Sequence, residues 1–343
     1  TFDHTTGIQQ PATNGETGAH EKVERLLPAY LAGISILELR ESVQRCLISI
    51  GVNPGGPDRS LSRVSRKGEP EASWTDLIDW AGEPQSRPSL STPLEIELRS
   101  KIVSELTREC VMNVFAGNGR DLESLGLALA QVPASSVVPP AGLSQQTFDQ
   151  VVRSSIRILG DSRRIQDVRG PSDNPPALLR KYIAAVASKH GPDEAVLLKS
   201  CIDAMATGVR EFLLQPAKLS LVQLDLPEGF ACPRCTRVHA DFAAGICTVC
   251  QTGLTDEPNY KFDRDSDYYA YRAGLNDPFR LHCEELTGQT GKTDGPRRQA
   301  YFQDVYLEGE EPLPTGIDLL SVTTTMEAGV DIGSLRGVVM SNM

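Results

Sequence analysis

The sequence predicts a mixed fold with a largely helical N-terminal region, a small four-cysteine module and a partial parallel α/β domain that the chain end cuts. Three observations predict it. Apolar residues recur at helical spacing between residues 94 and 214, two Cys-x-x-Cys pairs stand between 232 and 250, and residues 317–340 form an apolar run, a loop and a second apolar run.

Composition sets the bounds for this prediction. A chain of 343 residues with 40% hydrophobic content can bury two or three cores. It carries 45 acidic residues against 34 Lys and Arg, a net charge of -11. Proteins that hold DNA by bulk charge are basic, so any nucleic-acid contact must be a local patch.

The chain start is polar, and no apolar run approaches the length of a membrane span, so we expect no membrane partner. Four cysteines stand singly in apolar surroundings and are predicted to be reduced, buried thiols. Together these features predict a cytoplasmic protein. The single cysteines are Cys46, Cys110, Cys201 and Cys283.

Residues 1–93 are predicted to form a helix and a Pro- and Ser-rich loop region. The helical pattern covers Glu21–Ile50, and Gly51–Pro57 must be a loop because of its glycines and prolines. The polar stretch that follows is interrupted by Trp74–Trp80, whose two indoles we expect to anchor the loop to a core.

Residues 94–226 are predicted to form a helical accessory domain that ends in a strand. Helices are expected at Leu94–Phe115, Ser144–Leu159 with Ser144 as N-cap, Pro175–Lys189 and Asp193–Leu214, and a strand at Leu219–Leu226.

One stretch of this region, between Val151 and Lys181, is basic. It indicates either a solvated helical face or a patch that faces phosphates. Its basic residues are Arg153, Arg157, Arg163, Arg164, Arg169, Arg180 and Lys181.

Residues 227–256 carry the cysteine pairs Cys232, Cys235, Cys247 and Cys250. Each Cys-x-x-Cys turn points two sulfurs at one ion, and two such turns complete a tetrahedron of thiolates, as in zinc ribbons. With four cysteines and no vacant position, the predicted zinc is structural. Disulfides, a redox Cys-x-x-Cys pair, or His239 in place of one cysteine remain as alternatives.

Residues 257–343 are predicted to alternate strands and helices. A helix is expected at Asp265–Ala273, a strand at Arg280–Leu286, a turn at Thr287–Thr290, a helix at Pro296–Tyr306 and a strand at Ile317–Val322.

A polar loop follows the last of these strands. Hydroxyls at Thr323 and Thr324 can donate to a phosphate, Gly329 permits close backbone approach, and Asp331 presents a carboxylate.

Thr323 with Glu327-Ala-Gly329-Val-Asp331-Ile-Gly333 resembles motif V of superfamily-2 helicases, and the strand, Gly turn and Arg- and Phe-bearing helix upstream resemble the elements that precede it in those proteins. The resemblance implies that 257–343 is a partial second RecA-like domain. It implies nucleic-acid contacts by Thr323, Thr324, Thr287 and Gly288, and ATP coupling by Glu327, Gly329 and Asp331. More narrowly, the chain resembles the large helicases of the DISARM anti-phage system and their DNA-repair relatives.

A phosphate-binding alternative is Gly288-Gln-Thr-Gly-Lys-Thr293, which looks superficially like a Walker A loop. In that case Lys292 would hold phosphates and Thr293 the magnesium. Leu286 stands where the motif needs a small residue, and Asp318 is the only carboxylate near the following strand, which favours coincidence within a Gly turn.

The sequence therefore predicts a piece of an ATP-dependent DNA helicase or translocase. It lacks a convincing Walker A motif and a Walker B motif, and the arginine-rich motif VI would lie beyond Met343, so this chain alone is expected not to hydrolyse ATP. The complete protein would use ATP and Mg, and the expected partners are DNA, the rest of the helicase and a subunit of a defence complex. The alternative is a non-catalytic, zinc-stabilised subunit that binds nucleic acid or protein.

Overall fold

The computed structural model describes residues 2–3, 8–9, 33–117, 119–133, 136–224, 228–263, 268, 280–287, 290–291, 293–322 and 337. The chain divides into two compact units, each built from two stretches of sequence. Unit 1 comprises Thr1–Gln44 and Val103–Asp277, and unit 2 comprises Arg45–Ile102 and Pro278–Met343. Both units mix helices with small sheets.

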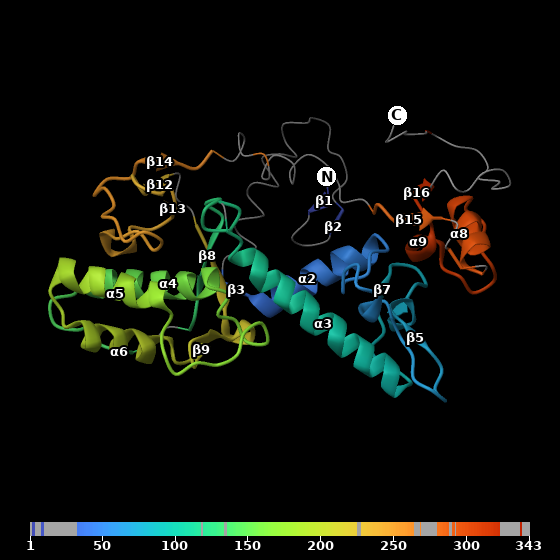
Figure 1. The fold of residues 1–343 in the computed structure, drawn as a ribbon, viewed down its shortest axis with the longest axis horizontal. Coiled ribbons are helices and arrows are strands. Elements are labelled where there is room, and N and C mark those ends of the chain that lie inside the picture. Colours follow the sequence, from blue (N-terminus) through green and yellow to red (C-terminus); the bar gives the residue numbers. More distant parts are fainter. Residues whose placement is uncertain are drawn as a thin grey trace. The chain divides into compact units, whose positions relative to one another are not determined.

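The α-helices follow one another along the chain as labelled in Figure 1. They are α2 (Ile36–Ser49), α3 (Pro93–Val114), α4 (Gln145–Asp161), α5 (Ala177–His190), α6 (Glu194–Met205), α8 (Asp294–Phe302) and α9 (Pro312–Thr315).

The strands that the structure describes are short and form seven small sheets. Their bounds are β1 (Phe2–Asp3), β2 (Ile8–Gln9), β3 (Ile34–Ser35), β4 (Arg63–Val64), β5 (Ala72–Ser73), β6 (Ile78–Asp79), β7 (Gln85–Ser86), β8 (Ala128–Gln131), β9 (Val209–Arg210), β10 (Leu213–Leu214), β11 (Ser220–Gln223), β12 (Glu228–Ala231), β13 (Val238–His239), β14 (Tyr260–Lys261), β15 (Cys283–Leu286) and β16 (Leu319–Val322).

Unit 1 is built around α4, α5 and α6, which contact one another pairwise. Their apolar faces, together with the end of α3 and the antiparallel sheet β3-β11-β8, form one continuous core. The residue after α3 approaches α4 closely at Gly160, where an added Cβ would lie 2.2 Å from Cγ of Phe115. Glycine is therefore required at this position for packing.

Three helix ends of unit 1 lie at residues that satisfy free backbone groups or permit the chain to turn. The Ser144 side chain accepts a hydrogen bond from the Thr147 amide at the start of α4, as the sequence predicts. Asp193 caps α6 in the same way, by accepting from the amides of Ala195 and Val196. Gly191 ends α5 in the left-handed conformation that glycine adopts without strain.

Unit 2 has its own core, which gathers Ile48, Leu77, Leu98 and Ile102 around Trp74. Trp80 packs edge to face on Trp74 at a centroid distance of 5.8 Å, and its ring N–H donates to the Thr75 carbonyl. The prediction that these indoles anchor the loop to a core is confirmed.

Unit 2 also contains β15 and β16, which pair in parallel, with α8 and α9 between them in the chain. Every other strand pair among the described residues is antiparallel. The predicted mixed fold is thus confirmed at the level of mixed helices and small sheets. The predicted RecA-like parallel α/β domain is not confirmed, because β15–β16 is the only parallel strand pair among the described residues.

Three sequence predictions need correction. The predicted helix Glu21–Ile50 includes Ile34 and Ser35, but these residues pair with β11 as strand β3, and α2 begins at Ile36. The predicted helix Asp193–Leu214 ends at Met205, because a turn at Gly208 leads into the β9–β10 hairpin. Cys283 is exposed rather than buried, because it lies on β15 of the small sheet.

Among the residues that the structure describes, no helix has the length and apolar character that crossing a membrane requires.

Candidate metal centre

The four predicted cysteines come together in unit 1. Sγ of Cys232 lies 3.4 Å from Sγ of Cys250, and Sγ of Cys235 lies 3.6 Å from Sγ of Cys247. All four sulfurs lie within 4.8 Å of one another. A tetrahedral ion with metal–sulfur bonds of about 2.3 Å needs sulfurs about 3.8 Å apart, so the cluster has the size of a metal site. None of the four is in a disulfide.

The two Cys-x-x-Cys turns share one backbone pattern. In the first, the Thr236 amide donates to the Cys232 carbonyl, and in the second the Gln251 amide donates to the Cys247 carbonyl. The residue after the second cysteine has a positive φ in both, 60° at Thr236 and 58° at Gln251. Two knuckles with the same backbone pattern therefore bring their four sulfurs together in one cluster.

The surroundings of the sulfurs favour a thiolate at one of them. Burial opposes charge on Cys250, but hydrogen bonds with Thr252 and contacts with the neighbouring sulfurs outweigh it and lower its pKa to about 6. Burial raises the pKa of Cys247. Because a bound cation stabilises the thiolate form, these buried and half-buried sulfurs suit a metal better than four free thiols.

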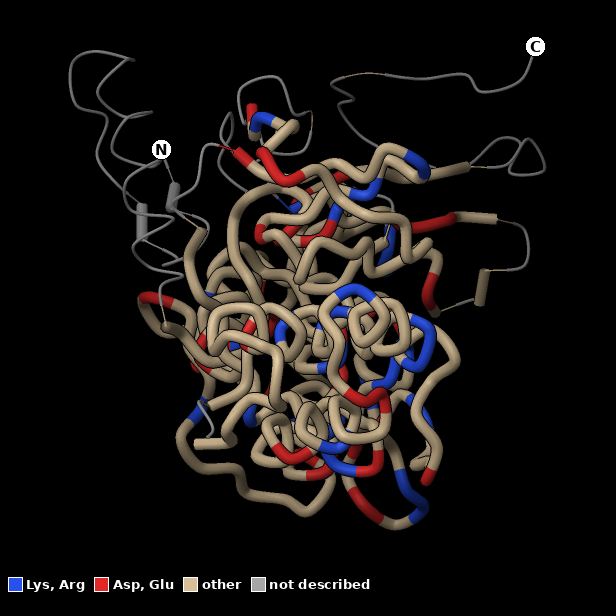
Figure 2. Tube along the Cα trace, turned by 90° about the vertical axis from the view of Figure 1, so that its left-hand side faces the viewer, with Lys and Arg blue, Asp and Glu red and all other residues tan. Residues whose placement is uncertain are grey.

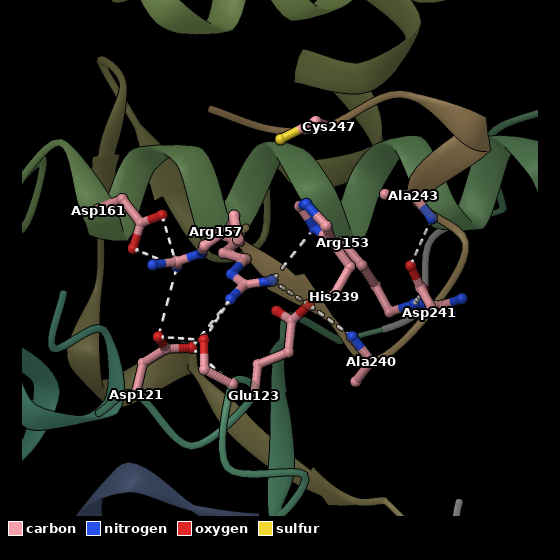
Figure 3. A network of polar contacts seen from close by, with 12 residues as sticks. Asp121, Glu123, Arg153, Arg157, Asp161, His239, Ala240, Asp241, Ala243 and Cys247 are labelled. Carbon is pink, nitrogen blue, oxygen red and sulfur yellow. Dashed lines mark hydrogen bonds and ion pairs between the residues drawn. The ribbon is translucent and has the colours of Figure 1, made fainter. Parts of the chain in front are cut away.

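Beside the cysteines lies a buried network of charges, shown in Figure 3. The Arg157 guanidinium, 5% exposed, donates to Asp121 at 3.1 Å, to Ser124 Oγ at 3.0 Å and to Glu123. Arg237 donates to Asp161 at 2.9 Å and lies 3.5 Å from Asp121. The network joins α4, the 119–126 turn and the cysteine module.

His239 is fully buried in this network. Its Nδ1 lies 3.3 Å from an Arg157 nitrogen, and arginine can only donate, so Nδ1 must accept and the ring carries its proton on Nε2. Burial and the neighbouring arginines hold the pKa of His239 well below its ordinary value. His239 is not among the residues of the sulfur cluster, so the alternative in which it replaces a cysteine is not supported.

Among the carboxylates of the network, Glu123 has the largest shift in pKa. Burial raises its pKa to about 7, although the Arg157 guanidinium opposes the rise, and Asp241 and Asp121 add to it. Its Oε1 also accepts from the Ala240 amide at 3.2 Å. Glu123 is therefore poised to change its charge near neutral pH.

The turn at 243–245, between the two knuckles, is held on the helices by further hydrogen bonds. Tyr182 Oη donates to the Ala243 carbonyl at 2.9 Å, and His190 Nε2 lies 2.9 Å from the Ala244 carbonyl. The Ala244 amide donates to Gln150 of α4 at 3.1 Å. The cysteine module thus packs against α4 and α5 within unit 1 (Figure 1).

Arg157 corrects the interpretation of the basic stretch between Val151 and Lys181. The sequence predicted a solvated face or a phosphate-facing patch, but Arg157 is in the interior, where it neutralises Asp121 and Glu123. Arg153 likewise bonds Asp241 at 2.8 Å, whereas Arg180 and Lys181 are exposed.

The acidic partners of these arginines were not predicted from the sequence. One signal was present, because Arg157 stands between Ile156 and Ile158 in an apolar part of the helix, where a charge needs a buried partner. Nothing in the 119–126 segment marked Asp121 and Glu123 as that partner.

The residues predicted for nucleic acid and ATP are only partly described. Thr287 follows the end of β15, where its amide donates to Thr290 Oγ1 at 2.9 Å and its carbonyl accepts from the Thr290 amide. Gly288, Lys292, Thr323, Thr324, Glu327, Gly329 and Asp331 lie outside the described residues. Most of the predicted helix at Asp265–Ala273 does so as well, and the assignment of these roles stays a prediction.

Comparison of the chain with protein-family models, with curated proteins and with solved structures returns no match.

Proposed function

We propose that the four cysteines bind a structural zinc ion. Thiolates are soft ligands that select zinc among the common divalent ions, and four of them leave no open position for chemistry. The ion would hold Cys232, Cys235, Cys247 and Cys250 together and fix the two knuckles against α4. Elemental analysis of the purified protein tests this, with one zinc per chain expected, and a folded sample free of metal would exclude it.

We further propose that the chain is part of an ATP-dependent superfamily-2 DNA helicase or translocase acting in phage defence or DNA repair. The supporting observation is the parallel pair β15–β16. Its register joins Leu286 to Val322, so both strands end at the same edge of the sheet. Thr287 lies at that edge, and Thr323, the first residue of the motif V-like segment, is bonded to Val322.

This geometry suits binding of the nucleic-acid backbone at that edge of the β15–β16 sheet. In parallel α/β sheets, ligands bind beyond the carboxyl ends of the strands. Thr287 follows the end of β15, and Thr323 comes directly after β16 in the sequence. Their hydroxyls can donate to phosphate oxygens. Asp331, eight residues further along, would link this contact to the state of ATP bound in the complete protein.

ATP turnover is the direct test. A form of the protein extended past Met343 should hydrolyse ATP faster when DNA is added, and Asp331→Ala should abolish that stimulation while DNA binding persists. An Asp331→Ala protein with unchanged DNA-stimulated turnover would exclude the coupling role.

A second candidate function is a non-catalytic subunit that binds nucleic acid or protein through the zinc-stabilised unit 1. The observation that favours it is the large core of unit 1, which contains no residue of β15 or β16. This candidate predicts that the extended form has no DNA-stimulated ATP turnover, so the same assay separates the two.

A further inference from the structure

Unit 2 contains a cleft of about 1040 Å³ that is separate from the cysteine cluster. We propose that this cleft binds single-stranded nucleic acid, with Arg59 and Arg87 on phosphates and Trp80 against a base. The inference rests on the proposed helicase function and adds a binding surface from residues 45–102, outside the segment that resembles helicases.

The first observation is the gathering of arginines around the cleft. Lys/Arg and Asp/Glu are interspersed over the described part of the chain (Figure 2), and the net charge is -11, so binding by bulk charge is unavailable to this acidic protein. The lining of the cleft is locally more basic than acidic, with six arginines and five carboxylates. The arginines are Arg59, Arg63, Arg87, Arg280, Arg297 and Arg298.

Three of the five carboxylates are already engaged inside the protein. Glu284 pairs with Arg298 at 3.2 Å, and Glu310 accepts from Tyr301 Oη at 2.6 Å and pairs with Arg297 at 3.4 Å. Asp76 accepts from the Ser73 amide at 2.7 Å as part of a helix cap. These contacts reduce the repulsion that the carboxylates would exert on a phosphate.

Arg59 and Arg87 are the arginines most available to a ligand. Both are exposed, and neither forms a salt bridge with a residue that the structure describes, although Arg87 lies near enough to Glu95 to help lower the pKa of that carboxylate. An exposed guanidinium can bind a phosphate with two parallel hydrogen bonds without first giving up an internal partner.

The aromatic side of the cleft is formed by Trp74 and Trp80. Trp74 is 9% exposed and serves the core, whereas Trp80 is half-buried. Stacking of a base on an aromatic ring requires an unpaired base whose face is free, so the indole favours a single strand over a duplex.

The cleft is continuous with the strand edge proposed to hold the nucleic-acid backbone. A hollow of about 240 Å³ at that edge is lined by Thr287 and shares Arg59, Asp294 and Arg298 with the cleft. A strand held by Thr287 would therefore pass directly to Arg59. An acidic peptide could also use the arginines, but it has no flat bases to stack on the indole.

Binding of a fluorescently labelled oligothymidylate to the full chain, followed by anisotropy over a range of salt concentrations, tests the proposal. The double variant Arg59→Ala with Arg87→Ala should bind about tenfold more weakly. The slope of the logarithm of the binding constant against the logarithm of salt concentration should fall in magnitude by about 1.4, or about 0.7 for each lost phosphate contact. Arg66→Ala is the matched control, because Arg66 is exposed in unit 2, pairs with Glu97 and does not line the cleft. Binding by this control should be unchanged.

Tryptophan fluorescence gives a second readout. The chain has two tryptophans, and both line the cleft, so oligothymidylate should quench their emission in the wild type and less in the double variant. Binding without quenching, or equal binding by the double variant, would overturn the proposal. Equal quenching by polyglutamate would assign the cleft to acidic peptides instead.

Failure of the cleft proposal can be distinguished from failure of the helicase proposal. If the double variant binds normally while Asp331→Ala abolishes DNA-stimulated ATP turnover in the extended form, the cleft is wrong and the helicase proposal stands. If the double variant loses binding while Asp331→Ala has no effect, the cleft stands as a nucleic-acid site without the coupling role.

Discussion

At the scale of single residues, Arg157 has the strongest predicted effect on stability. Its guanidinium neutralises Asp121 and Glu123 in the interior of unit 1. Arg157→Met should lower the free energy of unfolding by about 3–5 kcal/mol, because removal of one member of a buried ion pair leaves uncompensated charge. Urea denaturation measures this, with Arg180→Met on the exposed side of α5 as the control, and a loss under about 1 kcal/mol would contradict the role given to the network.

The free energy of unfolding should depend on pH through the titration of Glu123 and of His239. Burial raises the pKa of Glu123 from 4.5 to about 7, so the folded protein holds a proton that the unfolded chain has released, and stability falls as pH rises between these values. The pKa of His239 lies well below 6.5, so the unfolded chain binds a proton that the folded protein does not, and stability falls as pH drops below 6.5.

Because the two effects oppose each other between pH 4.5 and 6.5, they partly cancel in the wild type. Glu123→Gln should make stability rise more steeply with pH in this window, and His239→Leu should shift the slope in the opposite direction, each by up to about 1.4 kcal/mol per pH unit. Urea unfolding at a series of pH values measures the slopes. Two variants with the wild-type slope would show that neither group titrates as described.

At the scale of elements, the knuckles carry backbone strain that substitution can remove. Thr236 has a φ of 60°, which is uncommon for a β-branched residue. Thr236→Gly should raise the free energy of unfolding by about 0.5–1 kcal/mol, because the relief of about 1–2 kcal/mol of strain exceeds the entropic cost of glycine. Arg234→Gly, in the same knuckle but without a positive φ, should instead be neutral or destabilising, and an equal gain in both would rule out strain as the cause.

Local signals in the sequence predicted most of the helices, and tertiary contacts explain where they failed. The bounds of α3 and α4 follow from apolar spacing and from the cap at Ser144, which are properties of neighbouring residues. Ile34 and Ser35 are strand because β11 lies beside them, and no neighbour in the sequence shows that. The cysteine cluster was predictable because its spacing is local, whereas the contact of Arg157 with Asp121 spans 36 residues and was not.

At the scale of the whole molecule, the two units have separate cores that share no residue. The four cysteines lie in unit 1, whereas Trp74 and Trp80, the two tryptophans of the chain, lie in unit 2. Most of the described helical residues belong to unit 1, including all of α4, α5 and α6. Circular dichroism therefore reports mainly on unit 1, and tryptophan fluorescence reports on unit 2.

Removal of the metal should separate these two signals. A structural zinc contributes its binding free energy to folding, so chelation should lower the midpoint of the thermal transition seen by circular dichroism by at least several degrees. The transition seen by tryptophan fluorescence should stay within about a degree, because the core around Trp74 contains no residue of the cysteine module. Cys247→Ser without chelator should reproduce the shift, and Cys283→Ser, which changes an exposed cysteine of unit 2, should not. If both probes shift together, the two units unfold as one cooperative structure and the metal stabilises the whole chain.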